Sequence, residues 1–355
     1  MKILSISKAH PENYYTQEVL LSEFKKVWAQ KHHNPSRVER LHKAVSVGGR
    51  YLALKREEYY EIENFTQSND HFIRVATEVG EKAIRAALNK ANLNASDVDA
   101  LFFVSVTGVS TPSIDARMMN RLPFRKDTKR IPIFGLGCVA GAAGLARVHD
   151  YLRAYPDQVA ILLSVELCSL TLQREDLSIA NLISSGLFGD GGACIVAVGD
   201  ERAKTISSSE ERPSVYATQS RFYPDTEDVM GWSIGEKGFR VILQARVPQL
   251  ARDFIRGDVD EFLAAHQLTR ADIKWWVCHT GGPKVIDAFR DALEIPEEAV
   301  SLTRKSLRSV GNLSSASVLF VLADTIRERP TQKGDLGLLM AMGPGFCCEM
   351  VLLRW

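Results

Sequence analysis

Cys138 stands at a position that can activate a thiol. The apolar residues 131–134 are typical of a short strand, and residues 138–153 predict a helix that ends before Pro156. A thiol at a helix N-terminus lies at the positive end of the helix dipole, beside backbone N–H groups without helical partners, and both favour the thiolate. Cys138 is therefore a candidate nucleophile. The alternative is a small side chain that fills a tight corner between strand and helix.

Two further residues can complete a site of this kind. His279 ends the apolar segment 275–278 and precedes Thr280-Gly281-Gly282-Pro283, a flexible exit typical of active-site loops. Asn312 follows Gly311 at the start of a second predicted helix. An imidazole can take the thiol proton, and imidazole and amide N–H groups can hold an oxyanion. Each residue also has a structural interpretation, His279 as a buried polar side chain and Asn312 as a helix N-cap.

The segment 135–140, Gly-Leu-Gly-Cys-Val-Ala, also fits the dinucleotide-binding pattern G-x-G-x-x-G/A between a strand and a helix. That motif expects an acidic residue at the end of the next strand, about 20 residues on. Here the next strand, 159–165, ends at Glu166, which is somewhat too far. Nucleotide binding is therefore the weaker interpretation. The segment also lacks the local signature of papain-like cysteine proteases.

An internal repeat relates the two halves of the chain. Cys138 and Asn312 are 174 residues apart, and each opens a helix of small residues. Matching strands lie at nearly the same offset, 100–106 and 275–279 before and 159–165 and 336–342 after, and each of the latter is followed later by a second strand, 193–198 and 350–353. A pseudo-twofold relation between the halves would bring Cys138 and Asn312 face to face.

The repeat predicts the fold class. Nearly continuous apolar strands that alternate with helices predict parallel or mixed sheets covered by helices on both faces. The small residues 140–144 permit close backbone approach, so their helix is expected between two sheets. We expect a layered α/β fold of two pseudo-symmetric halves, residues 1–206 with Cys138 and residues 207–355 with His279 and Asn312.

Composition narrows the classes of partner. The 355 residues include 44 Lys and Arg against 43 Asp and Glu, a net charge of +1 that attracts neither nucleic acid nor an anionic membrane at long range. No apolar stretch approaches the ~20 residues that span a bilayer, and the N-terminus lacks a signal-peptide pattern, so we expect a cytoplasmic protein. The six cysteines show no C-x-x-C and no zinc spacing, which predicts free thiols and no metal site.

Taken together, the motifs resemble those of the type III polyketide synthases, the chalcone synthase superfamily, over nearly the whole chain. The motifs that carry the resemblance are 135–138 around the nucleophile, 187–191, His279 with 281–283, 311–316 and Gly343-Pro344-Gly345. Segments 107–113 and 228–232 are most similar to bacterial members that make alkylpyrones and alkylresorcinols from long acyl chains. The resemblance implies a thiolase-like αβαβα fold and a homodimer.

The resemblance also implies a mechanism. Cys138, paired as a thiolate with protonated His279, would take an acyl group from a CoA thioester. Malonyl-CoA would then lose carbon dioxide while His279 and Asn312 hold its enolate oxygen, because preorganised donors act most strongly on charge that develops in the transition state. Repeated extension and cyclisation would give pyrones or resorcinols. The substrates would be acyl-CoA and malonyl-CoA, with no metal or redox cofactor.

Substrate-pocket residues follow from the same resemblance. Phe188 matches the family's aromatic gate, and Thr111 and Thr171 match cavity-lining positions, the former near the dimer interface. Val241 stands where a second gating Phe is common, although nearby Phe239 leaves the register open; a small residue there favours a long acyl chain. Gly343, Pro344 and Gly345 complete the expected pocket.

The CoA phosphates would be held by a basic group that resembles the family's phosphate-contacting cluster. Its members are Arg37, Arg40 and Lys43, with Lys284 as a weaker candidate. The alternative is a solvated helix face.

Three other functions remain open at this point. One is the same chemistry with short or aromatic starters. Another is a single-condensation enzyme like ketoacyl synthase III, which typically has His-Gln-Ala-Asn at the histidine, where this chain has His279 followed by residues 280–283. The last is a non-catalytic protein that binds acyl-CoA or nucleotide. In this chain Thr280 also replaces the Pro that commonly follows the catalytic histidine in the family.

Overall fold

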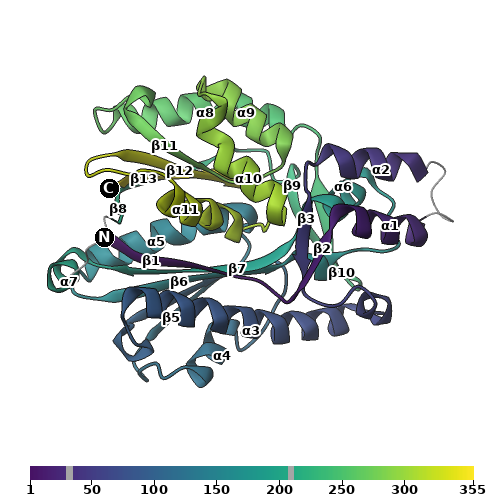
Figure 1. Ribbon diagram of the computed structural model, residues 1–355, viewed down its shortest axis with the longest axis horizontal. Coiled ribbons are helices and arrows are strands. Elements are labelled where there is room, and N and C mark those ends of the chain that lie inside the picture. The colour runs from purple at the N-terminus through teal and green to yellow at the C-terminus, as the bar shows by residue number, and fades with distance from the viewer. Residues whose placement is uncertain (29–34, 207–211) are drawn as a thin grey trace.

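The computed structural model describes residues 1–28, 35–206 and 212–355, and Figure 1 shows them as stacked layers of helices and strands. One sheet runs in the order β5, β4, β6, β7, β1 and the other in the order β8, β13, β12, β11. The nine strands are β1 (Lys2–Ala9), β4 (Ala100–Val104), β5 (Lys129–Ile133), β6 (Val159–Leu167), β7 (Asp190–Val198), β8 (Ser214–Phe222), β11 (Ile273–Cys278), β12 (Leu336–Gly343) and β13 (Cys347–Arg354).

The two sheets are joined at one point. Between β1 and β8 the ladder contains the single pair Lys2 and Ser214, so the strand order is continuous while the sheet itself folds into two layers. Pairing is parallel between β4 and β5, β4 and β6, and β11 and β12, and antiparallel elsewhere in both sheets. The prediction of mixed sheets is therefore confirmed.

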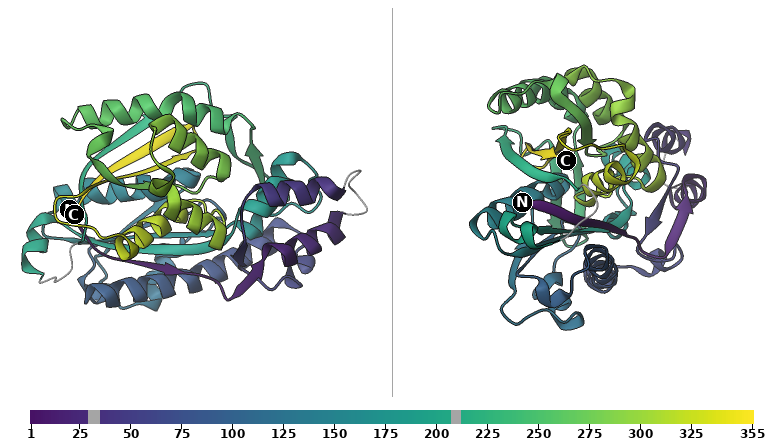
Figure 2. Two further views of the ribbon diagram at one scale, coloured as in Figure 1. Left: turned by 45° about the horizontal axis from the view of Figure 1, so that its top comes forward. Right: turned by 60° about the vertical axis from the view of Figure 1, so that its left-hand side comes forward.

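Helices fill the space between the sheets and cover their outer faces, which gives the predicted αβαβα order (Figures 1 and 2). Helices α5 (Ala140–Ala154) and α11 (Ala316–Glu328) lie in the middle, within one apolar core that both sheets share. Helices α3 (Phe65–Ala91) and α4 (Ile114–Arg121) cover the first sheet, and α8 (Val247–Ala264) with α9 (Pro283–Leu293) covers the second.

The predicted repeat is visible in the strand order. Reading each sheet outward from the junction gives β1, β7, β6, β4 in the first half and β8, β13, β12, β11 in the second. The central helices α5 and α11 are related in the same way, as the 174-residue offset between Cys138 and Asn312 predicts. The boundary expected between residues 206 and 207 adjoins segment 207–211, which lies outside the described residues.

Elements outside the repeat gather at one end of the layers (Figure 1). They are β2 (Asn13–Thr16), α1 (Gln17–Trp28), α2 (Pro35–Ala44), β3 (Gly49–Leu52), α6 (Ile179–Leu187), β9 (Met230–Gly235) and β10 (Gly238–Leu243). Helix α10 (Ser301–Val310) packs in the core with α8 and α9, and the short α7 (Asp200–Thr205) follows β7. Among the described residues, no helix is long and apolar enough to cross a membrane.

The central helices can meet because α5 presents glycine to α11. A Cβ on Gly141 would lie 2.1 Å from the carbonyl oxygen of Ser315 and 2.9 Å from Cγ1 of Val318. Another on Gly144 would lie 2.7 Å from Cδ1 of Leu162 in the first sheet. The small residues of α5 therefore allow it to lie between two layers at close range, as the sequence predicted.

The start of the predicted helix differs from expectation. Residues Gly137–Val139 form a 3₁₀ turn, and α5 begins at Ala140 rather than at Cys138. Gly137 has a left-handed φ of 58°, which a continuous α-helix does not allow. Cys138 therefore lies in a tight turn at the entrance to the helix.

Two glycine-to-alanine substitutions in helices test the close packing of α5. Gly141→Ala should lower the free energy of unfolding by about 2 kcal/mol or more, because the new methyl overlaps the backbone of Ser315. Gly257→Ala in α8 has no atom within 4 Å of the new methyl and should raise it by about 0.5 to 1 kcal/mol. Urea unfolding measures both. Equal effects would show that the α5 contact is looser than described.

Candidate active site

The turn that carries Cys138 is held from the opposite side by the end of β12. A Cβ on Gly137 would lie 2.6 Å from Cδ of Pro344, and one on Gly343 would lie 2.7 Å from the backbone nitrogen of Val139. Close packing of this turn against Pro344 therefore accounts for its glycine at position 137 without the dinucleotide-binding interpretation. That interpretation loses its support.

The starts of the two central helices meet at Cys138. Sγ of Cys138 lies 3.6 Å from Oγ of Ser314, two residues after Asn312. Both cysteine and asparagine are almost fully buried, and both line one cavity. The face-to-face arrangement that the repeat predicted is thus present at atomic detail.

His279 enters the same cavity from the end of β11. Its backbone N–H donates to the carbonyl of Met340 at 3.0 Å, and the hydroxyl of Thr303 in α10 donates to the preceding carbonyl, that of Cys278, at 3.2 Å. Because α10 leads directly into Gly311 and Asn312, one helix supports both the histidine and the asparagine loops. Nδ1 of His279 is buried and has no hydrogen-bond partner in the described part of the chain.

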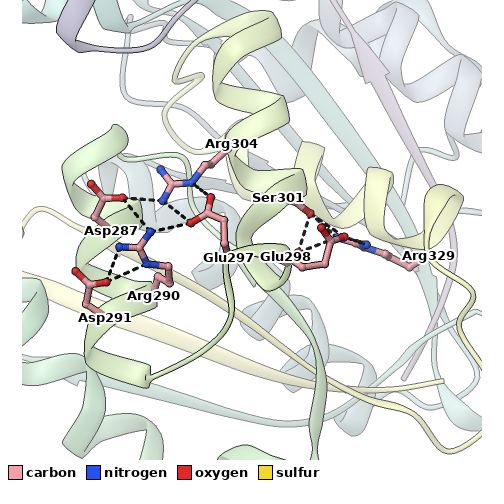
Figure 3. Close-up of polar contacts among 8 residues, drawn as sticks. All are labelled: Asp287, Arg290, Asp291, Glu297, Glu298, Ser301, Arg304 and Arg329. Carbon is pink, nitrogen blue, oxygen red and sulfur yellow. Dashed lines mark hydrogen bonds and ion pairs between the residues drawn. The ribbon is translucent and has the colours of Figure 1, made fainter.

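Ion pairs on the outer surface join α9, which follows the histidine loop, to α10 (Figure 3). Arg304 donates to Asp287 at 2.7 Å and also pairs with Glu297, which in turn accepts from Arg290 at 2.8 Å. A single exposed ion pair contributes little to stability, and a network of several linked pairs contributes more. The network links α9, which follows the histidine loop, to α10, which precedes the asparagine loop.

Burial opposes charge on both central groups. It raises the pKa of the Cys138 thiol to about 12, although the hydrogen bond with Ser314 acts in the opposite direction. It also lowers the pKa of His279 to about 4. Both shifts favour the uncharged thiol and imidazole, so a thiolate here requires transfer of the thiol proton to a neighbouring base such as His279, with the two opposite charges offsetting the cost of burial.

The shared cavity has a volume of about 460 Å³ and is lined by Cys138, His279, Asn312, Phe188 and Lys284 together with an apolar wall. The wall includes Leu41, Ile183, Met230, Leu243, Val247 and Phe289. A largely apolar cleft with a few convergent polar groups is the usual form of a small-molecule site.

Phe188 also borders a second, smaller cavity of about 90 Å³. Thr171 and Val241 line this cavity rather than the one that contains Cys138, and Trp28 and Trp232 line it too. The small side chains alone thus do not open a wide chamber. The cavity reaches Arg56 and Tyr60, which are partly exposed at the surface.

The remaining predicted residues lie apart from these cavities. Thr111 is exposed, and neither cavity includes it. Arg37, Arg40 and Lys43 are exposed on α2, and Lys43 pairs with Glu39 at 2.7 Å. Leu41 and Ala44 of α2, with Val45 just after it, line the first cavity, so the basic group lies near its rim. The turn Gly343-Pro344-Gly345 packs behind Cys138.

Sequence reasoning missed the polar groups that surround the helix starts. Glu166 is fully buried at the end of β6, where it accepts from Thr107 at 2.8 Å and from Ser315 at 2.5 Å. Burial raises its pKa despite these bonds. The sequence did contain a signal for this group, because Glu166 ends an otherwise apolar strand, and a carboxylate is costly to bury unless it is hydrogen-bonded.

Comparison with known proteins places these features in one family. The profile described as "Chalcone and stilbene synthases, N-terminal domain" matches residues 1–201, and the profile of the C-terminal domain matches residues 214–355. A 1,3,6,8-tetrahydroxynaphthalene synthase of Streptomyces peucetius subsp. caesius is 47% identical over 99% of this chain and 93% of its own length. A phloroglucinol synthase of Pseudomonas fluorescens is 30% identical over 97% of this chain and 96% of its own length.

Solved structures agree with the sequence comparison. The 1,3,6,8-tetrahydroxynaphthalene synthase of Streptomyces coelicolor A3(2), a bacterial type III polyketide synthase, superimposes with a TM-score of 0.93 at 31% identity, over 100% of this chain and 99% of that one. PKS-I of the brown alga Ectocarpus siliculosus gives a TM-score of 0.91 at 25% identity, over 99% and 97%.

Replacement of His279 tests the proton transfer. In His279→Ala no imidazole takes the thiol proton, so the high pKa that burial gives Cys138 determines its reactivity. Alkylation of Cys138 by iodoacetamide at pH 7 should become at least about tenfold slower, with a rate that rises about tenfold per pH unit up to pH 9. The native protein should react faster and with a flatter pH profile.

Peptide mass spectrometry follows the modification at Cys138 itself, and Cys138→Ala gives the background from the other five cysteines. Identical rates and pH profiles for native protein and His279→Ala would show that the imidazole does not activate this thiol.

Proposed function

The chain belongs to the chalcone and stilbene synthases, the type III polyketide synthases, and we propose that Cys138, His279 and Asn312 perform its condensation chemistry. Members of this family are condensing acyltransferases that use CoA thioesters. The observation that carries the proposal is the convergence of a thiol, an imidazole and an amide from both halves on one apolar cavity.

In the proposed loading step, the Cys138 thiolate attacks the carbonyl carbon of an acyl-CoA. The new C–S bond forms as the bond to CoA breaks, and the departing CoA thiolate takes the proton from the His279 imidazolium. Because the site is desolvated, the Cys138 thiolate and the His279 imidazolium attract each other strongly until acylation removes the negative charge of the cysteine.

In the proposed extension step, malonyl-CoA loses carbon dioxide and the bonding electrons become an enolate. N–H groups of His279 and Asn312 stabilise its oxygen, and its carbon attacks the Cys138 thioester, which releases the thiolate and leaves a β-ketoacyl-CoA. Decarboxylation supplies the carbanion, so we propose that the reaction needs no metal or redox cofactor. The product can return to Cys138 for another round before it cyclises.

We propose a long-chain acyl-CoA as the starter. In support, the first cavity is largely apolar, and Phe188 also borders the second cavity, which Val241 lines together with the partly exposed Tyr60. The products would be pyrones or resorcinols. We further propose that Lys284 and the basic face of α2 hold the CoA phosphates, and that the enzyme is a homodimer of the cytoplasm, where CoA thioesters are made.

A second candidate has support from the relatives. Those at 47% and 30% identity are named for 1,3,6,8-tetrahydroxynaphthalene and phloroglucinol, which are compact aromatic products. The small volume of the second cavity, about 90 Å³, also suits a short starter. In this case the same three residues would act and only the starter would differ.

The starter is decided by incubation with malonyl-CoA and acyl-CoA starters from acetyl to palmitoyl. Mass spectrometry should detect pyrones or resorcinols extended from the long chains, and none from Cys138→Ala. An aromatic product from malonyl-CoA alone would replace the long-chain proposal by the second candidate. Failure to extend any CoA thioester would contradict the condensation chemistry at this site.

The path beyond Phe188 is tested by Val241→Phe. The larger ring should lower kcat/KM for palmitoyl-CoA by about tenfold or more and leave acetyl-CoA nearly unaffected, because only the long chain must pass it. Ile242→Phe is the matched control, since adjacent strand residues point to opposite faces and Ile242 lines neither cavity. Equal losses for both starters in Val241→Phe would show that the chain takes another route.

A further inference from the structure

The side-chain amide of Asn312 is held in one orientation by its oxygen. Oδ1 accepts from the backbone N–H of Ser314 at 2.8 Å and from the hydroxyl of Ser317 at 3.2 Å. In the part of the chain that the structure describes, Nδ2 makes no hydrogen bond. Because Asn312 lines the cavity, its two Nδ2–H donors are left for a bound ligand.

The hydroxyl of Ser317 is placed to donate a hydrogen bond to Asn312. Oγ accepts the backbone N–H of Leu313 at 2.7 Å, so its single proton is available for Oδ1 of Asn312. Ser317 lies in the first turn of α11 and is only 1% exposed, so solvent does not compete for these bonds. Ser317 therefore links the backbone at the helix start to the side-chain amide of Asn312 through two hydrogen bonds.

The two orientations of the amide differ in what they offer the substrate. With Oδ1 bound as observed, N–H groups face the cavity and can stabilise an enolate oxygen. After a flip, Oδ1 would face the enolate and repel it, while Nδ2 would meet the N–H of Ser314, a donor against a donor. The bonds to Oδ1 thus select the orientation that can hold a negative charge.

We propose that Ser317 is a positioning residue that holds the amide of Asn312 with its N–H groups toward the enolate. Ser317 acts through Asn312 and does not line either cavity. The inference rests on the proposed function, since it needs Asn312 to stabilise the enolate. It adds that a hydroxyl behind the amide raises the rate of the decarboxylation that the amide supports.

The test separates enolate formation from thiol activation. Ser317→Ala should lower kcat for decarboxylation of malonyl-CoA by about three- to tenfold, the effect of one lost hydrogen bond, with KM nearly unchanged. Alkylation of Cys138 by iodoacetamide should keep its native rate, because His279 and the turn at Cys138 are untouched. A general loosening of the site would instead change both rates.

A matched control removes another buried hydroxyl from α11. Thr325 is 2% exposed, and its hydroxyl donates to the carbonyl of Val321 at 2.8 Å, so Thr325→Val should leave decarboxylation at its native rate. Native kcat in Ser317→Ala, or equal losses in the two variants, would overturn the proposal. If Ser317→Ala fails to fold, Ser317→Cys keeps a weak donor of similar size and should show a smaller loss in the same direction.

Asn312→Ala distinguishes failure of this inference from failure of the proposed function. If Asn312→Ala decarboxylates malonyl-CoA at the native rate, the proposed role of Asn312 is wrong. If Asn312→Ala is inactive while Ser317→Ala is native, only the positioning role of Ser317 is wrong.

Discussion

The contact between two buried helices, α5 and α11, is the constraint on which the rest of the structure depends. Gly141 lies against the carbonyl of Ser315 at a distance that admits no side chain, and this brings the two helix starts together between the sheets. Cys138 comes from the first half of the chain and Asn312 from the second, and both reach the same cavity. His279 joins them because its strand lies in the second sheet, beside the helix that supports Asn312. The proposed active site thus lies at the interface between the halves, and neither half could form it alone.

The walls of the two cavities, where we propose that the substrate binds, come largely from elements that the repeat does not contain. Helices α1, α2 and α6 and the hairpin of β9 and β10 gather at one end of the layers and form much of the walls of both cavities. Phe188 lines both cavities, and its two neighbours in the chain are hydrogen-bonded to Asn312. The N–H of Gly189 donates to the carbonyl of Asn312 at 3.0 Å, and the N–H of Asn312 donates to the carbonyl of Leu187 at 2.9 Å. The same two backbone hydrogen bonds therefore fix Phe188, which borders both cavities, and Asn312, which would hold the enolate.

Much of the fold could be predicted from the sequence because strands and buried helices leave periodic apolar patterns. Residues 140–144 predicted the central helix, and the 174-residue offset predicted the pairing of Cys138 with Asn312. The details that escaped prediction depend on contacts between distant segments. The 3₁₀ turn at Cys138 contains Gly137 with a positive φ packed against Pro344, and the small cavity beside Val241 is also lined by Trp28 and Trp232. The effect of burial on the Cys138 thiol also could not be predicted from the sequence. The helix start suggested a stable thiolate, whereas burial raises the pKa of the thiol.

The central claim is that the starts of α5 and α11 meet at Cys138, and an introduced thiol tests it most directly. Oγ of Ser314 lies 3.6 Å from Sγ of Cys138, so Ser314→Cys places a second sulfur near bonding range. Mild oxidation should join it to Cys138, which peptide mass spectrometry would detect, and should abolish condensation until a reductant restores it. Native protein, oxidised in parallel, should form no such bond. If both thiols of oxidised Ser314→Cys remain free and can be alkylated, the two helix starts do not meet as described.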